Sequence, residues 1–375
     1  MNDSIGNELL LNYEKQAEKT DRFLQGDIIP ILLGLYGEVG GVMATSKKYR
    51  REKKAYVGYK DAVEEEFGDA FWYFSALCRR LGISIENVFK NYGSPCKVED
   101  EIVPYLELYE CGSKSDVDSA LINLGCVTAR LLEENKNLDG LREIIPYFAL
   151  SFRNAIELTE LDFYKVVQSN LNKTLGRFAP LGQHVLDDFD AQFPVDEQLP
   201  WHFEIQITQR KSGQSYLKWN DVFIGDPLTD NIKNPDGYRF HDVFHMAFAA
   251  VLHWSPTFRS LIKHKRKSDP ATDMEQDGGR AIVVEEGLTA WLFSYAQSLD
   301  NFEGHDSVSF DVLKTIQKFV QGYEVEKCPL KLWEEAILQG YSVFRKVKEN
   351  EGGLVIGDRK NRKIFYRQLE EKNES

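Results

Sequence analysis

The stretch that decides the fold of the first half of the chain is Glu64–Leu77, which reads EEEFGDAFWYFSAL. Its apolar residues recur at intervals of three and four, the spacing of one face of an α-helix. On that helix Glu66 and Asp69 project from one face, because they are three residues apart. Phe67 and Phe71 lie on a neighbouring face of the helix, which is predicted to pack in a hydrophobic core. The segment therefore predicts a buried helix that carries two carboxylates beside its hydrophobic packing.

Two carboxylates held side by side repel each other and lose hydration, and a divalent cation offsets both penalties. Glu38, within the preceding segment Gly37–Gly41 (GEVGG), is a candidate third ligand. Oxygen ligands without His or Cys favour Mg²⁺ or Mn²⁺, whose natural substrate is a phosphate chain. The alternative is a solvated acidic first turn, which favours the helix dipole without any metal.

Three segments resemble the MazG-type all-α nucleoside triphosphate pyrophosphohydrolases: GEVGG at Gly37–Gly41, EEFGDAFWYFSAL at Glu65–Leu77 and LGIS at Leu81–Ser84. The resemblance covers roughly the first half of the chain. It implies two antiparallel helices with ExxE and ExxD motifs, which bind Mg²⁺ and cut a nucleotide between its α and β phosphates.

The resemblance implies that Glu38, Glu66 and Asp69 are three of the four metal-binding acids of that family. The fourth position is Gly41, so the metal site would be one carboxylate short. Glu65 lies next to Glu66 on the same helix but points elsewhere, which makes it a poor substitute ligand and a candidate catalytic base.

A further match lies at Asn170–Phe178, NLNKTLGRF, which is similar to the closing NxxKxxxR/K signature of the family. It implies that Asn170, Lys173 and Arg177 contact nucleotide or phosphate.

A basic cluster, Lys47–Lys54, lies between the two acidic segments. One interpretation is that cations such as Lys47 and Lys48 hold the phosphates of the substrate. The other is a solvated connector beside the C-terminal end of a helix, where cations are favoured in any case.

These residues predict a magnesium-dependent hydrolase that acts on an acid anhydride and converts a nucleoside triphosphate to its monophosphate and pyrophosphate. One alternative is a nucleotide-sensing protein whose incomplete acid set binds without cutting. Another is a metal-dependent phosphohydrolase with its site in the C-terminal half.

The rest of the pattern predicts a mainly α fold with a helical bundle over residues 1–180, a linker over 181–200 and a mostly helical C-terminal domain over 201–375. The linker stretch is rich in Pro, Gly and Asp and has no sustained period. In the last domain we expect four helices and one or two short β-hairpins. The predicted segments are Phe240–Trp254, Gly279–Leu299, Val308–Gln321 and Leu330–Lys348 for helices, Phe203–Gln209 with Tyr216–Ile224 for one hairpin and Leu354–Tyr366 for the other.

An internal similarity links Ile83–Asn91 and Leu161–Asn170, each of which closes a group of predicted helices. One hypothesis is a pair of related helical halves, a single chain that imitates a dimer. The other is the generic appearance of a helix that follows a short polar turn.

The predicted helix at Phe240–Trp254 carries His241 and His245, four residues apart on one face, with Asp242 beside them. Two imidazoles at that spacing can share one transition metal. A carboxylate ligand or base could come from the pair Glu285 and Glu286.

Three interpretations of this HDxxH pattern compete. A zincin-like site needs Glu where Asp242 stands. An HD-type phosphohydrolase needs an upstream His on a helix, whereas the candidate, His202, lies in a strand-like segment. The third interpretation is an ordinary helix start with locally hydrogen-bonded histidines. Nearby residues from Gly225 to Trp291 resemble the C-terminal domain that accompanies some MazG-type proteins.

Composition limits the classes of function. The chain has 375 residues, and its formal net charge of −13 argues against general binding to nucleic acid or to an anionic membrane surface. The longest apolar runs, Ile28–Gly37 and Met246–Trp254, are half the length of a membrane span. Five cysteines without a CxxC pair, and no recognisable secretory leader, lead us to expect a cytoplasmic protein with free thiols. A homo-oligomer is compatible with the sequence.

Overall fold

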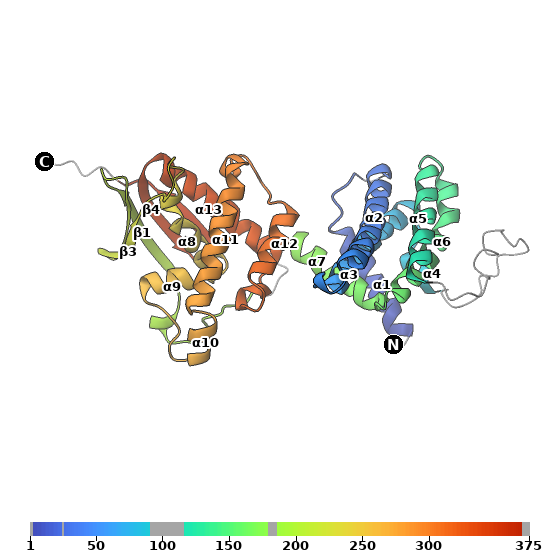
Figure 1. The fold of residues 1–375 in the computed structure, drawn as a ribbon, viewed down its shortest axis with the longest axis horizontal. Coiled ribbons are helices and arrows are strands. Elements are labelled where there is room, and N and C mark those ends of the chain that lie inside the picture. The colour runs from blue at the N-terminus through green and yellow to red at the C-terminus, as the bar shows by residue number, and fades with distance from the viewer. Residues whose placement is uncertain (1–2, 25, 91–115, 179–185, 370–375) are drawn as a thin grey trace, which may run out of the picture. The chain divides into compact units, whose positions relative to one another are not determined.

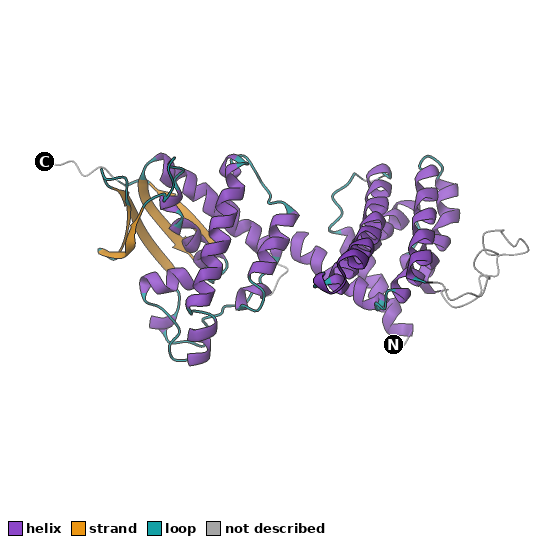
Figure 2. Ribbon diagram, in the orientation of Figure 1, coloured by secondary structure: helices purple, strands orange, loops and turns teal. Residues whose placement is uncertain are grey.

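The structure is a computed structural model of the chain and describes residues 3–24, 26–90, 116–178 and 186–369 (Figure 1). The chain divides into two compact units, Met1–Ala179 and Pro180–Ser375, each with its own hydrophobic core. Helices dominate both units, and the strands of the described residues form one sheet in the second (Figure 2). The predicted mainly α fold is confirmed. The free cysteines are Cys78, Cys126 and Cys328 in the described residues, and the other two lie outside them.

The first unit consists of helices throughout its described part. They are α1 (Asp3–Glu18), α2 (Ile29–Glu52), a 3₁₀ turn (Lys53–Ala55), α3 (Tyr59–Leu81), α4 (Ile85–Lys90), α5 (Val117–Glu133), α6 (Leu138–Leu158) and α7 (Phe163–Phe178).

Helices α2 and α3 form a hairpin whose backbones approach closely. Gly34 and Gly41 lie on the face of α2 toward α3, because a Cβ built at either position would overlap the side chain of Tyr73 or Glu66. Glycine costs about 1 kcal/mol relative to Ala inside a helix. The hairpin gains close packing at these two positions in return.

Aromatic rings join α3 to α6 on the side of α3 away from α2. Phe74 and Phe148 stack with ring centroids 4.6 Å apart, and Phe67 and Phe71 contact Phe152 at 5.6 and 6.1 Å. All five side chains are fully buried, and each contributes about 1.5–3 kcal/mol through burial. This packing fixes the rotation of α3 and therefore the direction in which its acids point.

The ends of α3 and α6 close in the same way. Gly82 and Glu160 both adopt the left-handed conformation, with φ of 70° and 59°. The following residue then bonds back into the last turn of each helix. The bonds are Ile83 N–H to Cys78 O at 2.9 Å and Leu161 N–H to Ile156 O at 3.2 Å. This geometry is compatible with two related halves, α2–α4 and α5–α7, and is also a common way for unrelated helices to end. The hypothesis of two related halves stays a prediction.

By length and composition, one segment in the described residues, Ile29–Ala55, would be able to cross a membrane. A core helix of a soluble protein passes the same test. In this unit α2 packs against α3 and buries Ile31, Leu32 and Leu35. The expectation of a cytoplasmic protein without a membrane partner stays a prediction.

The second unit combines a sheet with helices. The strands are β1 (His202–Gln209), β2 (Ser215–Trp219), β3 (Val222–Leu228), β4 (Gly352–Asp358) and β5 (Lys363–Arg367). The α-helices are α8 (Asp242–Val251), α9 (Pro256–Ile262), α10 (Pro270–Glu275), α11 (Gly279–Gln297), α12 (Phe310–Phe319) and α13 (Leu330–Glu349). The 3₁₀ turns are Val195–Glu197, Tyr238–Phe240, Asp300–Phe302 and Glu324–Lys327.

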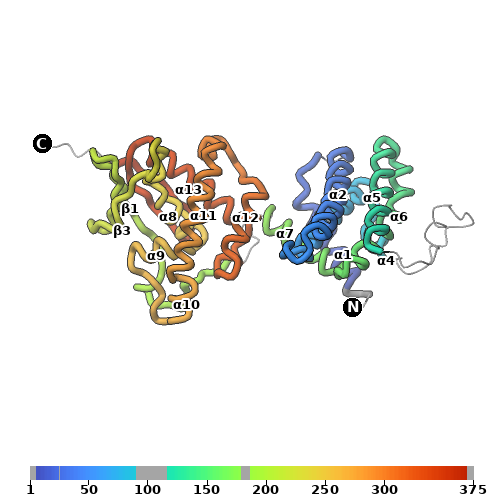
Figure 3. Tube along the Cα trace, viewed as in Figure 1, coloured from blue at the N-terminus to red at the C-terminus, as the bar shows by residue number. Residues whose placement is uncertain are grey.

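The strands form a single five-stranded antiparallel sheet in the order β3-β2-β1-β4-β5. Two features differ from the predicted pair of hairpins. The segment Tyr216–Ile224 is not one strand, because Asn220 and Asp221 turn it back with φ of 47° and 65°. The C-terminal hairpin also joins the first one, since β4 pairs with β1 over seven residues. Both strands are labelled in Figure 1, and Figure 3 draws the same part of the chain as a tube.

Helix α8 lies at the centre of the second unit. All ten of its residues are buried, and it packs against β4, β5 and α13. One face of the sheet closes this core, because Phe203, Ile205 and Ile207 alternate inward along β1 and are at most 1% exposed. The start of α8 is thereby held in a rigid environment.

The predicted linker is partly wrong. Residues 186–200 belong to the second unit, where Asp190 is 1% exposed and pairs with the buried guanidinium of Arg259. Arg359 donates to the backbone oxygen of Leu199 and, at 2.9 Å, to Asp188. The stretch looked like a linker because its acids resemble solvated residues, whereas they neutralise buried arginines. Residues 181–185 lie outside the described part.

Candidate functional site

The structure brings the three predicted acids of the first unit together. Glu38 comes from α2, and Glu66 and Asp69 come from the facing side of α3. Burial, then the charges of Asp69 and Glu66, raise the pKa of Glu38 to about 7. Three carboxylates therefore share one partly buried region in which their charges disfavour one another.

Gly41 lies on the same side of α2 as Glu38, three residues further along. A Cβ built at Gly41 would overlap Oε2 of Glu66, so the carboxylate of Glu66 occupies the space beside this position. The position that bears the fourth acid in the family thus faces the other acids in this chain, as the sequence predicted.

Helix α7 contributes the polar groups that hold Asp69. The ammonium of Lys173 lies 2.8 and 2.5 Å from the two carboxylate oxygens of Asp69 and 2.7 Å from Oε1 of Glu65. The amide of Asn170 donates to Asp69 Oδ1 at 2.9 Å. Tyr13 of α1 donates its hydroxyl to Asn170 Oδ1 at 2.7 Å.

Tyr13 is a residue that sequence reasoning missed. Its side chain is fully buried, and burial, followed by the charge of Asp69, raises its pKa well above the usual value. The phenol therefore stays protonated and fixes which side of the Asn170 amide faces Asp69. The sequence signal was only its place in the apolar stripe of α1, between Leu10 and Ala17.

Some predicted substrate contacts lie elsewhere. Lys47 and Lys48 are exposed at the end of α2, about 14 Å beyond Glu38 along the helix axis at 1.5 Å per residue. The ammonium of Lys48 lies 4.3 Å from the ring centre of Tyr56. Arg177 is mostly buried one turn beyond Lys173. The structure therefore brings Asn170 and Lys173 to the acids, but not the two lysines of α2.

The donor set of the first unit fits Mg²⁺ or Mn²⁺. Carboxylate oxygens are the ligands that these ions prefer, and the raised pKa of Glu38 is the sign of negative charge that a cation would relieve. Lys173 already neutralises part of this charge at Asp69.

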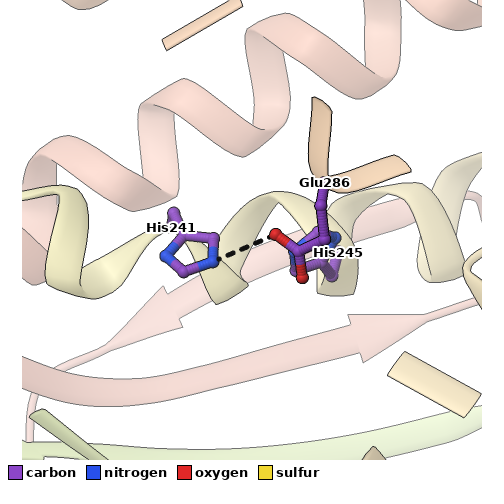
Figure 4. Close-up of side chains that lie close together, drawn as sticks. All are labelled: His241, His245 and Glu286. Carbon is purple, nitrogen blue, oxygen red and sulfur yellow. Dashed lines mark ion pairs between the residues drawn. The ribbon is translucent and has the colours of Figure 1, made fainter. Parts of the chain in front are cut away.

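The second unit contains a different cluster, shown in Figure 4. Nε2 of His241 lies 3.5 Å from Glu286 Oε2, and Nε2 of His245 lies 3.3 Å from Glu286 Oε1. His241 precedes α8, His245 lies on α8, and Glu286 lies on α11. Among the described residues these three side chains form a group that could hold a metal ion, because one donor atom of each lies within 4.8 Å of the other two. The HDxxH helix and the Glu285–Glu286 pair predicted from the sequence therefore do meet.

A second layer of residues surrounds this cluster. Glu285 is fully buried and accepts from Ser255 Oγ at 2.6 Å and from the Thr257 backbone N–H at 2.8 Å. Its Oε1 lies 2.8 Å from Nδ1 of His245. Burial lowers the pKa of His245, but the charges and hydrogen bonds of Glu285 and Glu286 together outweigh it, and the pKa is raised well above the usual value. No local sequence pattern predicted the contacts of Ser255 and Thr257.

Asp242 is not part of the three-ligand group. It is buried at the start of α8, and burial raises its pKa. His202 lies on β1 with most of its side chain exposed, so the helical upstream histidine of an HD-type site is not supplied by this residue.

Comparison with known families gives one result. Residues 184–370 match the model of the MazG C-terminal domain. The second unit thus links the chain to the MazG family. The match does not extend to the helical unit that precedes it, so the resemblance of that unit to the pyrophosphohydrolases stays a prediction. No curated protein and no solved structure matches the chain.

Proposed function

We propose that the chain is a nucleoside triphosphate pyrophosphohydrolase that works at the acid cluster of its first unit. The proposal is carried by the convergence of Glu38, Glu66 and Asp69 with Lys173 at the junction of α2, α3 and α7. Negative groups for a divalent cation and a positive group for phosphate are both needed to hold a triphosphate chain. The MazG C-terminal domain in the same chain supports this assignment.

In this proposal Glu38, Glu66 and Asp69 would hold Mg²⁺ or Mn²⁺, which when bound supplies Lewis-acid stabilisation of phosphate charge. Asn170 keeps Asp69 in one orientation through its 2.9 Å hydrogen bond. Lys173 places a positive charge beside the acids and can pair with phosphate oxygens. Its salt bridges with Asp69 and Glu65 keep it in position when no substrate is bound.

The reaction adds water to the α phosphorus and breaks the bond from that phosphorus to the oxygen bridging to the β phosphorus. The products are a nucleoside monophosphate and pyrophosphate. Glu65 is the candidate base that accepts the proton of the attacking water. Lys173 and Asn170 then stabilise charge that develops on the departing pyrophosphate.

The second candidate function is nucleotide binding without hydrolysis. It is favoured by Gly41, which leaves the acid set one carboxylate short of the family pattern, and by the salt bridge of Lys173 with Asp69. A protein of this kind would bind a triphosphate and release it unchanged.

The test uses the full chain with a panel of nucleoside triphosphates and Mg²⁺, with products separated by chromatography. At least one triphosphate should yield its monophosphate and pyrophosphate. Asp69→Asn should abolish turnover with unchanged helical circular dichroism. Glu64→Gln is the matched control, because Glu64 lies on the same helix but contacts Lys165 and Ser169 instead.

Two results would contradict the proposal. Release of orthophosphate would mean that a different bond is cut. Full activity in Asp69→Asn would place the chemistry outside the acid cluster. Tight nucleotide binding without any product in the unmodified chain would favour the sensing function.

A further inference from the structure

The hydrogen bonds of the two imidazoles in the second unit determine where their protons lie. Nδ1 of His241 lies 2.9 Å from the backbone oxygen of Tyr238, which can only accept. Nδ1 of His245 lies 2.8 Å from Glu285, whose carboxylate already accepts from Ser255 and Thr257. Both Nδ1 atoms therefore carry hydrogen, and in the neutral rings both Nε2 atoms present lone pairs.

These lone pairs point at another acceptor. The Nε2 atoms lie 3.5 and 3.3 Å from the two carboxylate oxygens of Glu286. Nε2 of His245 is completely buried and makes no hydrogen bond in the described residues. Three acceptors that face one another are stable only with a positive charge between them, which is either an added proton or a metal ion.

We infer that His241, His245 and Glu286 form a site for one divalent transition-metal ion in the second unit, of which Zn²⁺ is the best-matched probe. Two imidazole nitrogens and one carboxylate are a common set of three protein ligands for Zn²⁺. With bonds of about 2.0–2.1 Å, neighbouring ligands of a tetrahedral ion lie about 3.3–3.4 Å apart. The two nitrogen–oxygen separations, 3.5 and 3.3 Å, are close to that value, although they end on different oxygens of Glu286. One donor atom of each of the three residues lies within 4.8 Å of the other two, so small side-chain rotations would bring all three onto one ion.

The surroundings match those of a metal site rather than of a surface ion pair. Metal-binding histidines usually donate their second N–H to a carboxylate or backbone oxygen, as His245 and His241 do here. The ring of Tyr238 stacks on His241 with centroids 4.3 Å apart and planes inclined by 4°. Both imidazoles are thus held in the orientation that directs Nε2 at Glu286.

The site is closed on one side and open on the other. The side chain of His245 is fully buried and that of His241 is 10% exposed, whereas that of Glu286 is 38% exposed. An ion there would have three protein ligands and a fourth position that solvent or a small oxygen ligand can reach, which is the arrangement of catalytic rather than structural zinc sites.

The test measures Zn²⁺ binding by the full chain without a polyhistidine tag, after removal of metal with a chelator. The unmodified chain should bind one Zn²⁺ at this site and show the visible absorption of low-symmetry Co²⁺ when Co²⁺ replaces it. Glu286→Gln should weaken Zn²⁺ binding by more than about 100-fold, because changes in the second layer alone cost about 10–100-fold. His202→Ala is the matched control, because His202 is exposed on β1, and should change nothing.

A second pair of variants keeps the result clear. His241→Ala should lose Zn²⁺ and, since His241 precedes the rigid part of α8, should retain the circular dichroism of the unmodified chain. Glu66→Gln separates this site from the acid cluster of the first unit, and should keep the Zn²⁺ of the second. If Glu286→Gln or His241→Ala binds Zn²⁺ as tightly as the unmodified chain, the cluster is an imidazolium–carboxylate pair and the inference is wrong.

Discussion

Replacing Gly41 with Glu should restore a fourth carboxylate to the acid cluster and make the stability of the first unit depend more strongly on Mg²⁺. The new side chain would start on the face of α2 that carries Glu38 and that faces Glu66 on α3. A Cβ at this position displaces the carboxylate group of Glu66, whose Oε2 and Cδ it would overlap and which is the end of a flexible side chain. The variant is therefore expected to fold.

The magnitude follows from two opposing effects. A residue with a side chain replaces glycine inside a helix, which stabilises the helix by about 1 kcal/mol. A fourth carboxylate about 4–8 Å from Glu66 repels it by about 2–4 kcal/mol at an effective dielectric constant of 20. Glu38 already has a pKa of about 7, so the cluster has little room for more negative charge. Without a cation, the net effect is a loss of about 1–3 kcal/mol.

Gly41→Gln is the control variant, because glutamine has nearly the shape of glutamate but no charge. It gains the same helix propensity over glycine without the repulsion between carboxylates. Thermal unfolding of the full chain and of both variants would be followed with chelator and with saturating Mg²⁺. Gly41→Gln should be at least as stable as the unmodified chain and respond to Mg²⁺ no more than it does. Gly41→Glu should be the least stable in chelator and gain the most from Mg²⁺. An equal Mg²⁺ response in the two variants would refute the assignment of this position to the metal site.

Other perturbations test the second unit and the support of the acid cluster. The pKa of His253 is lowered to about 3, chiefly by burial. Because unfolding restores a pKa near 6.5, the unfolded state gains a proton below that value, and this residue alone should lower the free energy of unfolding by about 2 kcal/mol from pH 7 to pH 5 in chemical denaturation. The raised pKa of His245 contributes with the opposite sign, so the effect of His253 is the difference in slope between the unmodified chain and the variant. His253→Asn, which tolerates the φ of 61° at this position, should flatten that slope, and an unchanged slope would contradict the assignment. Asp190→Asn removes the nearer of the two carboxylates that pair with the buried guanidinium of Arg259 and leaves Asp277 at 3.7 Å. The loss should approach the about 3–5 kcal/mol of unfolding free energy that breaking a buried pair costs; a loss under 1 kcal/mol would argue against a buried ion pair. Tyr13→Phe leaves Asn170 Oδ1 without its donor. The variant should lose about 1–3 kcal/mol of unfolding free energy and turn over triphosphate more slowly, with both quantities measured on the same preparation. Full turnover would show that this hydrogen bond does not position Asp69.

Local patterns predicted the four longer helices of the second unit, because each has enough residues to show its period. They did not predict α9 and α10, which have only seven and six residues. The helix expected at Gly279–Leu299 is α11, and the one expected at Leu330–Lys348 is α13. For the sheet, the hairpins were predictable but the pairing between them was not. Turn residues indicate hairpins, but the pairing of β1 with β4 joins segments on either side of all six helices of the second unit, and no local signal marks such a contact.

The buried charges of the second unit were hidden for a related reason. Arg266 lies within the basic run Lys263–Lys267, a composition typical of a solvated face. Its side chain is nevertheless fully buried against Asp277 and Glu324. Composition describes how charged a segment is and does not show whether partners far along the chain neutralise it. The same limit explains why composition predicts a linker over 181–200, although 186–200 belongs to the second unit.

At the candidate sites, the sequence revealed ligands but not the residues that support them. The three-residue spacing of Glu66 and Asp69 and the four-residue spacing of the histidines follow from helix geometry alone. The contacts of Tyr13 and Ser255 depend on tertiary packing, and their own segments gave no hint of them. Lys48 was a candidate because of its charge, although helix length places it far from the acids.

The position of α7 shows why the closing motif follows the second helical half rather than the first. If Gly82 and Glu160 are equivalent, as their matching turns indicate, then Ile144 and Tyr147 stand in the second half where Glu66 and Asp69 stand in the first. At these two positions the second half therefore has no carboxylates. It contributes α7 instead, whose Asn170 and Lys173 reach Asp69 across the unit. The acid cluster takes its carboxylates from one half and its amide and ammonium from the other, so neither half alone would be sufficient to form it.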